Sequence, residues 1–427
     1  MSGKRGAMSG KRGAVRGKRG ASCIALAAFA ALCSCRSVSR PTTAAATPVA
    51  GPVTATRPAP PDRTYRFIVG AESDDEVALI EFRPCPFDST GALVSTPGCG
   101  ARTLRTYQVG LYPSDIEGPH GVVASNDGRS FYVSIAHGRP TGYLQKFDFA
   151  TGKLIDQVEL GMFPATVDIA PLGELVYVIN FNFEDPEMQP SSLSIVDGET
   201  MLEVARPTTC RMPHGSRLNP QGTRHYSGCM MNDLLVEVSA RGFEVTRTLN
   251  VAPHAESREQ TAAQQRAGNA QHAHGSPDPA ISNRCSPTWA QPSADGSKVY
   301  VACNAGAEIV EVDVDRWTVS RRWKTPAAPY NLAVTPDGAL LVATQKGPGT
   351  VSIWRLRDAT LLADIPGTRK VASGVAVSPD SRYAFATLEG IGGDPGTVDI
   401  IDLAALKKVA SVTVGKQAGG IAVVTAR

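Results

Sequence analysis

The chain has few aromatic residues and no hydrophobic run long enough to span a membrane. Aromatics make up 6% of its 427 residues, and the longest apolar stretch, residues 21–32, covers only 12 positions. A helix needs about 20 apolar residues to cross a bilayer. The sequence therefore predicts no transmembrane helix.

Acidic residues are missing from the first twenty positions, which hold seven of the 43 lysines and arginines. Without this segment the formal charge of +3 falls by seven to −4. The basic balance thus belongs to a leader, and the rest of the chain gives no electrostatic support for a nucleic-acid partner. With 42% hydrophobic and 19% charged residues the chain is globular, and its 41 glycines and 31 prolines favour many turns between short strands.

Residues 1–34 have the features of a lipoprotein-type signal peptide. A basic, Gly-rich repeat precedes the apolar run, which ends in Leu32-Cys33-Ser34-Cys35. This ending is similar to a bacterial lipobox, in which the last cysteine takes the lipid, although Cys33 stands where a small residue is usual. We therefore expect export and lipidation of Cys35. The alternative is an ordinary signal peptide cleaved near residues 44–46, and translation starts at either Met1 or Met8.

Residues 35–62 are rich in Pro, Thr and Ala and have almost no large apolar side chain. Such a composition cannot bury enough surface to fold. We predict a flexible tether here, which joins the lipid anchor to a folded domain over residues 63–427.

The folded domain repeats itself. The second positions of its turn dipeptides are 45, 49, 74, 42 and 43 residues apart, and the long interval contains an insertion at about 252–284. Within each unit, apolar residues alternate along short strands that end in turns, as is typical of antiparallel sheet. The intervals match the four-stranded blades of a β-propeller. The turn dipeptides are Asp127-Gly128, Leu172-Gly173, Gln221-Gly222, Asp295-Gly296, Asp337-Gly338 and Asp380-Ser381.

The two ends of this domain complete one more unit. Residues 420–424 look like a first strand without successors, and residues 65–69, 77–82 and 104–109 look like strands two to four without a first. Joining them pairs strand edges that would otherwise be exposed. The predicted fold is therefore all-β: a seven-bladed β-propeller of four-stranded antiparallel blades, closed by a composite blade built from both termini.

The repeats resemble those of YVTN-type seven-bladed propellers, which occur in surface-layer-like and periplasmic proteins. Residues 374–379, 331–338 and 300–301 best match the family pattern Pro-x-Gly-Val-Ala-Val-Ser-Pro-Asp-Gly followed by Tyr-Val. The resemblance covers residues 64–427. It implies the fold and, as the usual role, ligand or protein binding on a rigid ring, but no particular chemistry.

Six cysteines follow the leader and fall into three local pairs. An even number of cysteines without any CxxC motif, in an exported protein, favours disulfides over zinc binding or thiol chemistry. In two pairs one cysteine precedes a first strand and the other ends a second strand, so the two can meet across a hairpin. The alternative is buried free cysteines. The predicted pairs are Cys85 with Cys99, Cys210 with Cys229, and Cys285 with Cys303.

Six of the seven histidines map to the face where first strands begin and second strands end. His120 and His214 start first strands in matching Pro-His-Gly fragments, and His137 follows a second strand. These three are candidate ligand-binding residues. His120 and His214, together with Glu389 from an equivalent loop, are also candidate ligands of a divalent metal such as zinc, copper or iron.

A structural interpretation of these histidines competes with the functional one. In that interpretation histidine is one of several residue types that fill an equivalent loop position, and its ring forms a hydrogen bond with the backbone. The residues predicted at this position in other repeats are Ala165, Thr288 and Asn331. Acidic residues 72–76 lie on the same face, where we expect a solvated turn. The aspartates that recur after third strands are expected to cap turns. They are Asp148, Asp197, Asp313 and Asp402.

These features favour an exported, lipid-anchored propeller that binds a cell-envelope protein, a glycan or a small ligand on its histidine-bearing face. The alternative is a metal-dependent propeller enzyme, similar to lactonase-like hydrolases or to streptogramin-lyase-like proteins, which share Pro-His-Gly at strand starts. The chain lacks the repeated Trp-Phe-Thr-Glu strands of those lyases. It also lacks a phosphate-binding loop, a nucleophile elbow, a haem-attachment motif and a zincin motif, so binding is preferred to catalysis.

Overall fold

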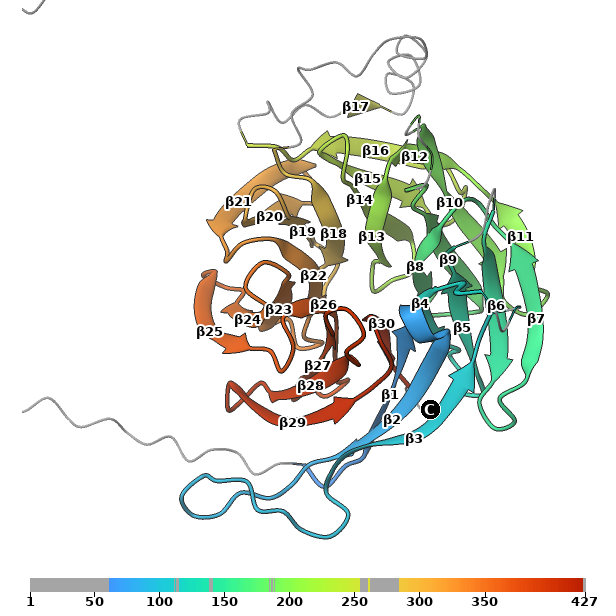
Figure 1. Cartoon of the computed structure of the whole chain (residues 1–427). Helices are drawn as coiled ribbons and strands as arrows, with labels where there is room; N and C mark the ends of the chain where they lie inside the picture. The colour runs from blue at the N-terminus through green and yellow to red at the C-terminus, as the bar shows by residue number, and fades with distance from the viewer. Residues whose placement is uncertain are drawn as a thin grey trace, which may run out of the picture. The chain divides into compact units, whose positions relative to one another are not determined.

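The computed structural model describes residues 61–424 apart from 111, 113–114, 138–140, 184, 186, 188, 254–259 and 262–283. Seven antiparallel sheets form a closed ring, with neighbouring innermost strands in contact all the way around it (Figure 1). Among the described residues, the single helical element is the short 3-10 turn η1 (Glu72–Asp74), and none of them belongs to a helix able to span a membrane. The predicted seven-bladed β-propeller is confirmed.

Each sheet is one blade, and each blade is named after its innermost strand. In order from the channel outward, the first three blades are β30 (Ala418–Val423), β1 (Tyr65–Ala71), β2 (Glu76–Arg83) and β3 (Gly100–Gln108); β4 (Pro119–Ala124), β5 (Ser130–Ile135), β6 (Tyr143–Asp148) and β7 (Leu154–Glu159); and β8 (Pro164–Ile169), β9 (Leu175–Asn180) and β10 (Pro190–Asp197), with β11 (Leu202–Ala205) and β12 (Thr208–Arg211) both pairing with β10.

The other four blades have the same order. They are β13 (Pro213–Leu218), β14 (Arg224–Cys229), β15 (Leu234–Ser239), β16 (Val245–Asn250) and β17 (Gln260–Thr261); β18 (Pro287–Pro292), β19 (Lys298–Cys303), β20 (Glu308–Asp313) and β21 (Thr318–Lys324); β22 (Pro329–Val334), β23 (Leu340–Gln345), β24 (Thr350–Arg355) and β25 (Thr360–Pro366); and β26 (Val371–Val377), β27 (Tyr383–Glu389), β28 (Thr397–Asp402) and β29 (Lys407–Thr413).

The pairing of β30 with β1 closes the ring. Val69 lies opposite Ile421 and Phe67 opposite Val423 in antiparallel register. The closure also buries aromatic surface between neighbouring blades, because the fully buried ring of Phe67 stacks on Phe385 with centroids 4.5 Å apart. The composite blade predicted from the two ends of the domain is confirmed.

The recurring turns hold themselves by short side-chain contacts. Ser125 Oγ donates to Asp127 Oδ1 at 2.6 Å, and the same contact recurs in the β18, β22 and β26 blades. The aspartates after third strands accept N–H bonds from their own turns, as Asp148 does from the Thr151 backbone at 2.6 Å. Both sets of aspartates therefore serve the turns, as their recurrence predicts.

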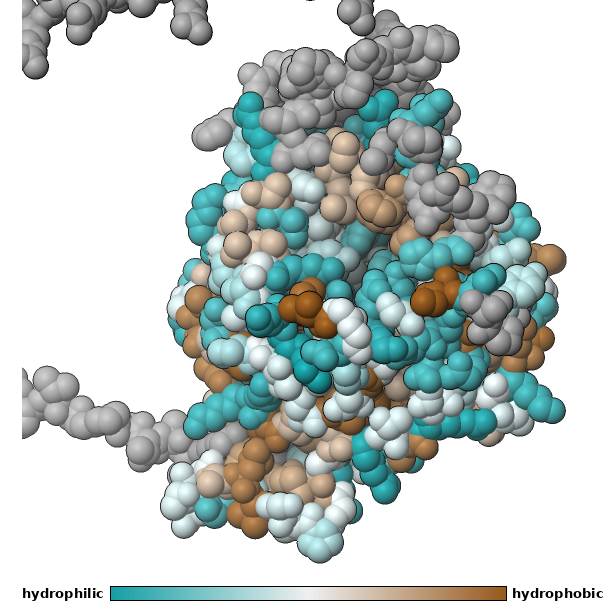
Figure 2. All heavy atoms as spheres, in the orientation of Figure 1, coloured by the Kyte–Doolittle hydropathy of each residue, from teal (hydrophilic) through white to brown (hydrophobic). Residues whose placement is uncertain are grey.

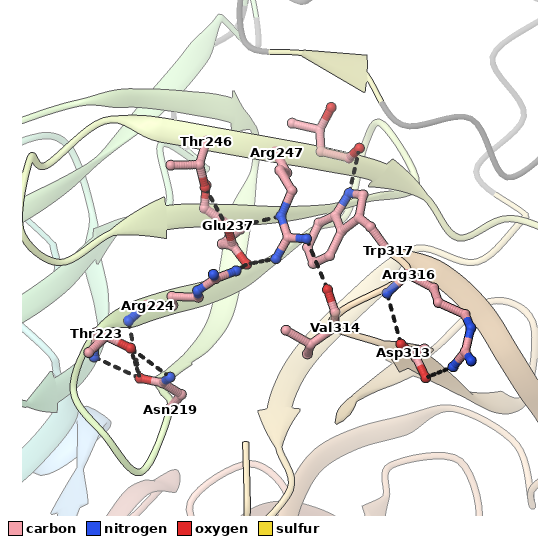
Figure 3. Close-up of polar contacts among 11 residues, drawn as sticks. Asn219, Thr223, Arg224, Glu237, Thr246, Arg247, Asp313, Val314, Arg316 and Trp317 are labelled. Carbon is pink, nitrogen blue, oxygen red and sulfur yellow. Dashed lines mark hydrogen bonds and ion pairs between the residues drawn. The ribbon is translucent and has the colours of Figure 1, made fainter. Parts of the chain in front are cut away.

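Buried charge joins the β13 and β18 blades. Glu237 on β15 accepts hydrogen bonds from Thr246, Arg224 and Arg247 (Figure 3). The guanidinium of Arg247 lies 4.1 Å from the centroid of the Trp317 ring, which comes from the β18 blade. This carboxylate thus fixes an arginine that packs across the blade boundary.

The three predicted disulfides are present. Cys85–Cys99 closes the long loop between β2 and β3, where hydrophobic side chains gather in the space-filling view (Figure 2). Cys210–Cys229 and Cys285–Cys303 each join the segment before an innermost strand to the end of the next strand. Cys35 lies outside the described residues, as do the signal peptide, nearly all of the tether, and the insertion histidines His254, His272 and His274.

Candidate functional site

The innermost strands begin at one mouth of the channel with a shared register. In five blades the strand starts with a proline that pairs with the last residue of the following strand, as Pro119 does with Ile135. The residue after this position is therefore equivalent in all seven blades, and Tyr330, not Asn331, corresponds to His120. We call these seven residues the inner ring: Gly419, His120, Ala165, His214, Thr288, Tyr330 and Ser373.

The residues that follow the second strands form an outer ring at the same mouth. Each is held against the segment that leads into an innermost strand, as when the Lys346 backbone N–H donates to Ala328 O at 2.9 Å. The ring is apolar in three consecutive blades (β4, β8 and β13) and charged in three others (β22, β26 and β30), so the mouth has an apolar half and a charged half. The outer ring consists of Glu72, Ala136, Phe181, Met230, Asn304, Lys346 and Glu389.

Glu72 lies between two of the predicted histidines. Its Oε1 is 2.8 Å from His137 Nε2, and its Oε2 is 3.4 Å from His120 Nδ1. The Glu72 side chain is 9% exposed, whereas His120 and His137 are 22% and 35% exposed. Burial opposes its ionisation, but the two imidazoles outweigh burial and hold the pKa of Glu72 well below its usual range. Glu72 is therefore a buried carboxylate that two imidazoles hold in its ionised form.

His214 uses both of its ring nitrogens. Nδ1 donates to Thr288 O at 2.8 Å, so Nε2 accepts from the Tyr330 hydroxyl at 3.0 Å. Burial, together with the neighbouring His120, lowers the pKa of His214 to about 3. His214 is therefore neutral at physiological pH and positions Tyr330 at the mouth.

Lys346 and Glu389 complete the charged half. Lys346 Nζ lies 4.0 Å from the centroid of the Tyr330 ring and 3.1 Å from Glu389 Oε1. Burial would lower the pKa of Lys346, but Tyr330 and Glu389 outweigh burial and raise it. Glu389 thus serves to hold a lysine in its charged form.

Aromatic rings and methionines fill the apolar half. The Phe163 ring meets the His137 ring edge-on at 5.0 Å, and Phe181 meets His214 in the same way at 5.0 Å. Phe183 stacks on Phe181 and is 54% exposed, so this cluster reaches solvent. The methionines of the cluster are Met162, Met212, Met230 and Met231.

The three proposed metal ligands do not converge. His214 bonds to Thr288 and Tyr330, Glu389 pairs with Lys346, and His120 faces Glu72. Within the described ranges, no group of three or more His, Cys, Asp or Glu side chains is placed to hold a metal ion. Metal binding stays a prediction from the sequence, and the structure instead brings His120, His137 and His214 together around one mouth.

A cavity of about 50 Å³ lies in the channel beneath the inner ring, and a second of about 230 Å³ lies farther along the innermost strands. The first has room for a few water molecules or a small polar group. His120, His214 and Tyr330 line it from the mouth side. The side chains that line both cavities, and so separate them, are Val122, Val167, Arg217 and Ile421.

Close packing requires the glycine of each Pro-His-Gly fragment. A Cβ on Gly215 would lie 2.1 Å from Trp289 Cε3, and one on Gly121 would lie 2.2 Å from Ala165 O. Both glycines therefore allow the neighbouring innermost strand to approach. This part of the fragment shapes the channel and performs no chemistry.

Four residues that share the site with the predicted histidines do not stand out in the sequence. The sequence predicts Glu72 in a solvated turn, but η1 carries this side chain to the mouth and buries it. Tyr330 could be found by aligning the repeats on the prolines that start their first strands. Arg217 and Lys346 have no counterpart in the repeat pattern that would single them out.

The fold and this mouth together define a class of protein, a seven-bladed β-propeller with one asymmetric channel mouth. No protein-family model matches the chain, and neither does any curated protein. Among solved structures, hydrazine synthase from Kuenenia stuttgartiensis is similar, with a TM-score of 0.53 and 18% identity over 68% of this chain and 78% of that chain. At this identity the likeness supports the propeller fold alone.

Proposed function

We propose that the protein is an exported, lipid-anchored module of the cell envelope whose channel mouth binds a small ligand with one apolar side and one polar side. The observation that carries this proposal is the division of the outer ring. Phe181 and Met230 lie in its apolar half, and Glu72, Lys346 and Glu389 make up its charged half. A ligand seated across the mouth would meet both kinds of surface.

A purely structural ring would repeat its chemistry from blade to blade. The turn aspartates do so, since the Ser or Thr contact to Asp recurs in four blades. The outer ring occupies equally equivalent positions but differs in every blade except for its two glutamates. Variation at positions that the fold makes equivalent supports a binding role.

The envelope location rests on separate observations. Three disulfides are expected in an oxidising compartment rather than in a reducing cytoplasm. The predicted signal peptide and Cys35 supply export and the anchor. An intact mass that includes a lipid, and that loses it in Cys35→Ala, tests the anchor independently of the mouth.

The binding proposal is tested by thermal unfolding in a panel of small amphipathic molecules. A ligand of the mouth raises the melting temperature of the wild-type protein by mass action. The rise should be lost in Phe183→Ala, because this exposed ring belongs to the apolar half. It should be kept in Leu172→Ala, which removes an even more exposed apolar residue from the turn between β8 and β9. Equal responses of the two variants would contradict the proposal.

A further inference from the structure

Arg217 occupies an unusual place in the channel. It lies on the innermost strand β13 and lines both the cavity beneath the inner ring and the second cavity beyond it. Of the four side chains that line both cavities, the other three are aliphatic. A permanent positive charge therefore stands among aliphatic side chains between the two cavities of the channel.

The contacts of Arg217 leave much of its hydrogen-bonding capacity unused. The guanidinium carbon lies 4.6 Å from the centroid of the Trp289 ring, and one nitrogen donates to Ser216 O at 2.8 Å. Among the described residues, no carboxylate lies within 4.0 Å of its nitrogens. A guanidinium has five donors in a planar fork, and stacking on Trp289 leaves the edge of that fork open to the channel.

Asp168 is the acid that faces this charge from the neighbouring blade. Its oxygens accept the backbone N–H groups of Leu218 at 2.7 Å and Ile169 at 3.0 Å. Burial raises the pKa of Asp168 despite the presence of Arg217. The hydrogen bonds of Asp168 thus go to the backbone, and its charge interacts with Arg217 only at a distance.

Other arginines of the ring differ from Arg217 in this respect. Three other arginines that lie over aromatic rings also hold a carboxylate directly: Arg247 with Glu237, Arg321 with Glu311 and Arg382 with Asp402. Arg217 has the stacked ring without the direct ion pair. The partner that Arg217 lacks, compared with these three arginines, is an anion.

The walls of the upper cavity also carry unused polar groups. Trp289 Nε1 and Asn331 Oδ1 are buried without a hydrogen-bond partner among the described residues, although both side chains line this cavity. Buried polar atoms nearly always have a hydrogen-bond partner. One donor and one acceptor without partners in the same cavity therefore point to a polar ligand.

We propose that the channel is an anion site in which Arg217 binds the carboxylate of a small organic acid that enters through the histidine-bearing mouth. A carboxylate fits the planar fork of a guanidinium and carries a single charge, which one arginine can balance. The volume of about 50 Å³ suits a short acid. The inference deepens the proposed function, because it assigns the polar end of the mouth ligand to Arg217.

The test is a titration of the full-length protein with sodium acetate at constant ionic strength, followed by ligand-observed NMR. We expect saturable acetate binding and no binding of acetamide, the neutral analogue. Arg217→Met should abolish binding, and Arg217→Lys should weaken it about tenfold because lysine lacks the fork. Asp168→Asn should strengthen it, since this change removes a competing negative charge and keeps an acceptor for Leu218.

The variants also separate this inference from the proposed function. Phe183→Ala removes part of the mouth and leaves the channel intact, so its acetate affinity should equal that of the wild-type protein. Absence of saturable acetate binding, or unchanged affinity in Arg217→Lys, overturns the anion site. If Arg217→Met fails to fold, the Arg217→Lys and Asp168→Asn titrations decide the question. Loss of the mouth ligand in Phe183→Ala without any acetate binding would leave the proposed function standing and the anion site refuted.

Discussion

Two buried carboxylates of this propeller have the same charge but different kinds of partner. Glu237, between the β13 and β18 blades, is 2% exposed and bonds to Arg224 and Arg247. Glu72, at the channel mouth, is 9% exposed and faces His120 and His137. In both cases burial opposes ionisation, and the partners outweigh burial and lower the pKa of the carboxyl.

The difference lies in what the partners do when conditions change. A guanidinium stays charged throughout the range in which the protein is folded, whereas an imidazole loses its charge near neutral pH. Glu237 is thus committed to the packing of two blades (Figure 3). Glu72 instead faces two partly exposed imidazoles at the channel mouth, an arrangement that suits a binding site better than a blade interface.

The largest expected effect is on the blade interface. Glu237→Gln leaves Arg247, whose side chain is only 17% exposed, without its buried counter-charge, and breaking such a pair costs about 3 kcal/mol of unfolding free energy. Urea unfolding measures the loss. Arg224→Ala is the matched control, because this partner is 44% exposed and its removal should cost about 1 kcal/mol or less. Equal losses in the two variants would show that Glu237 is not the centre of this interface.

A second prediction concerns pH and two other buried groups, His214 and His225. Burial lowers the pKa of each to about 3, with a smaller contribution from His120 for the former and Arg217 for the latter. Below the ordinary value of 6.5 the unfolded chain therefore binds more protons than the folded one, and stability falls as pH falls from 6.5 towards 3.

The expected slope is about 1.4 kcal/mol per pH unit for each histidine. Urea unfolding between pH 6.5 and 5 measures this contribution, because the lowered pKa values of Glu72 and Glu237 confine their own losses to pH below their ordinary value of 4.5, while the raised pKa of Asp168 acts in the opposite direction and adds stability as pH falls. A flat profile over this window would mean that neither histidine is held neutral in the folded state.

A third, smaller effect distinguishes the two histidines from each other. His225 stacks on Tyr177 with centroids 5.4 Å apart, and neither of its ring nitrogens has a partner among the described residues. His225→Phe keeps the stacking and removes two unpaired polar atoms, so it should stabilise the fold by about 1–2 kcal/mol at pH 7. His214→Phe loses two hydrogen bonds and should destabilise it. Either change should halve the slope below pH 6.5.

The sequence predicts the propeller ring well because each blade is specified by a local pattern that recurs along the chain. Alternating strands, recurring turn dipeptides and two partial units at the chain ends are local patterns, and the structure confirms the blades that they predict, including the pairing of β1 with β30. The site is less accessible to such reasoning. His120 and His137 are conspicuous as residue types, but Glu72 reaches them from a region 48 and 65 positions away along the chain, where β1 packs beside β4 of the next blade. The prolines that start five first strands align the inner ring in the sequence, but the contacts of Glu72 with the histidines follow only from the three-dimensional structure.

The smallest effect on stability, and the sharpest test of the comparison, comes from Glu72→Gln. We expect a loss of about 1 kcal/mol or less at pH 8, because uncharged imidazoles can remain at the mouth without a counter-charge, unlike the arginine beside Glu237.

The lowered pKa of Glu72 means that the ionised carboxyl stabilises the fold above its ordinary pKa of 4.5. This stabilisation is lost only as pH falls below that value. Between pH 8 and 5 the carboxyls of Glu72 and Glu237 therefore both stay ionised, and the loss in each variant should be constant over this range. Urea unfolding of both variants at the two pH values decides this, and a Glu72→Gln loss as large as that of Glu237→Gln would show that Glu72 is a structural carboxylate of the same kind as Glu237.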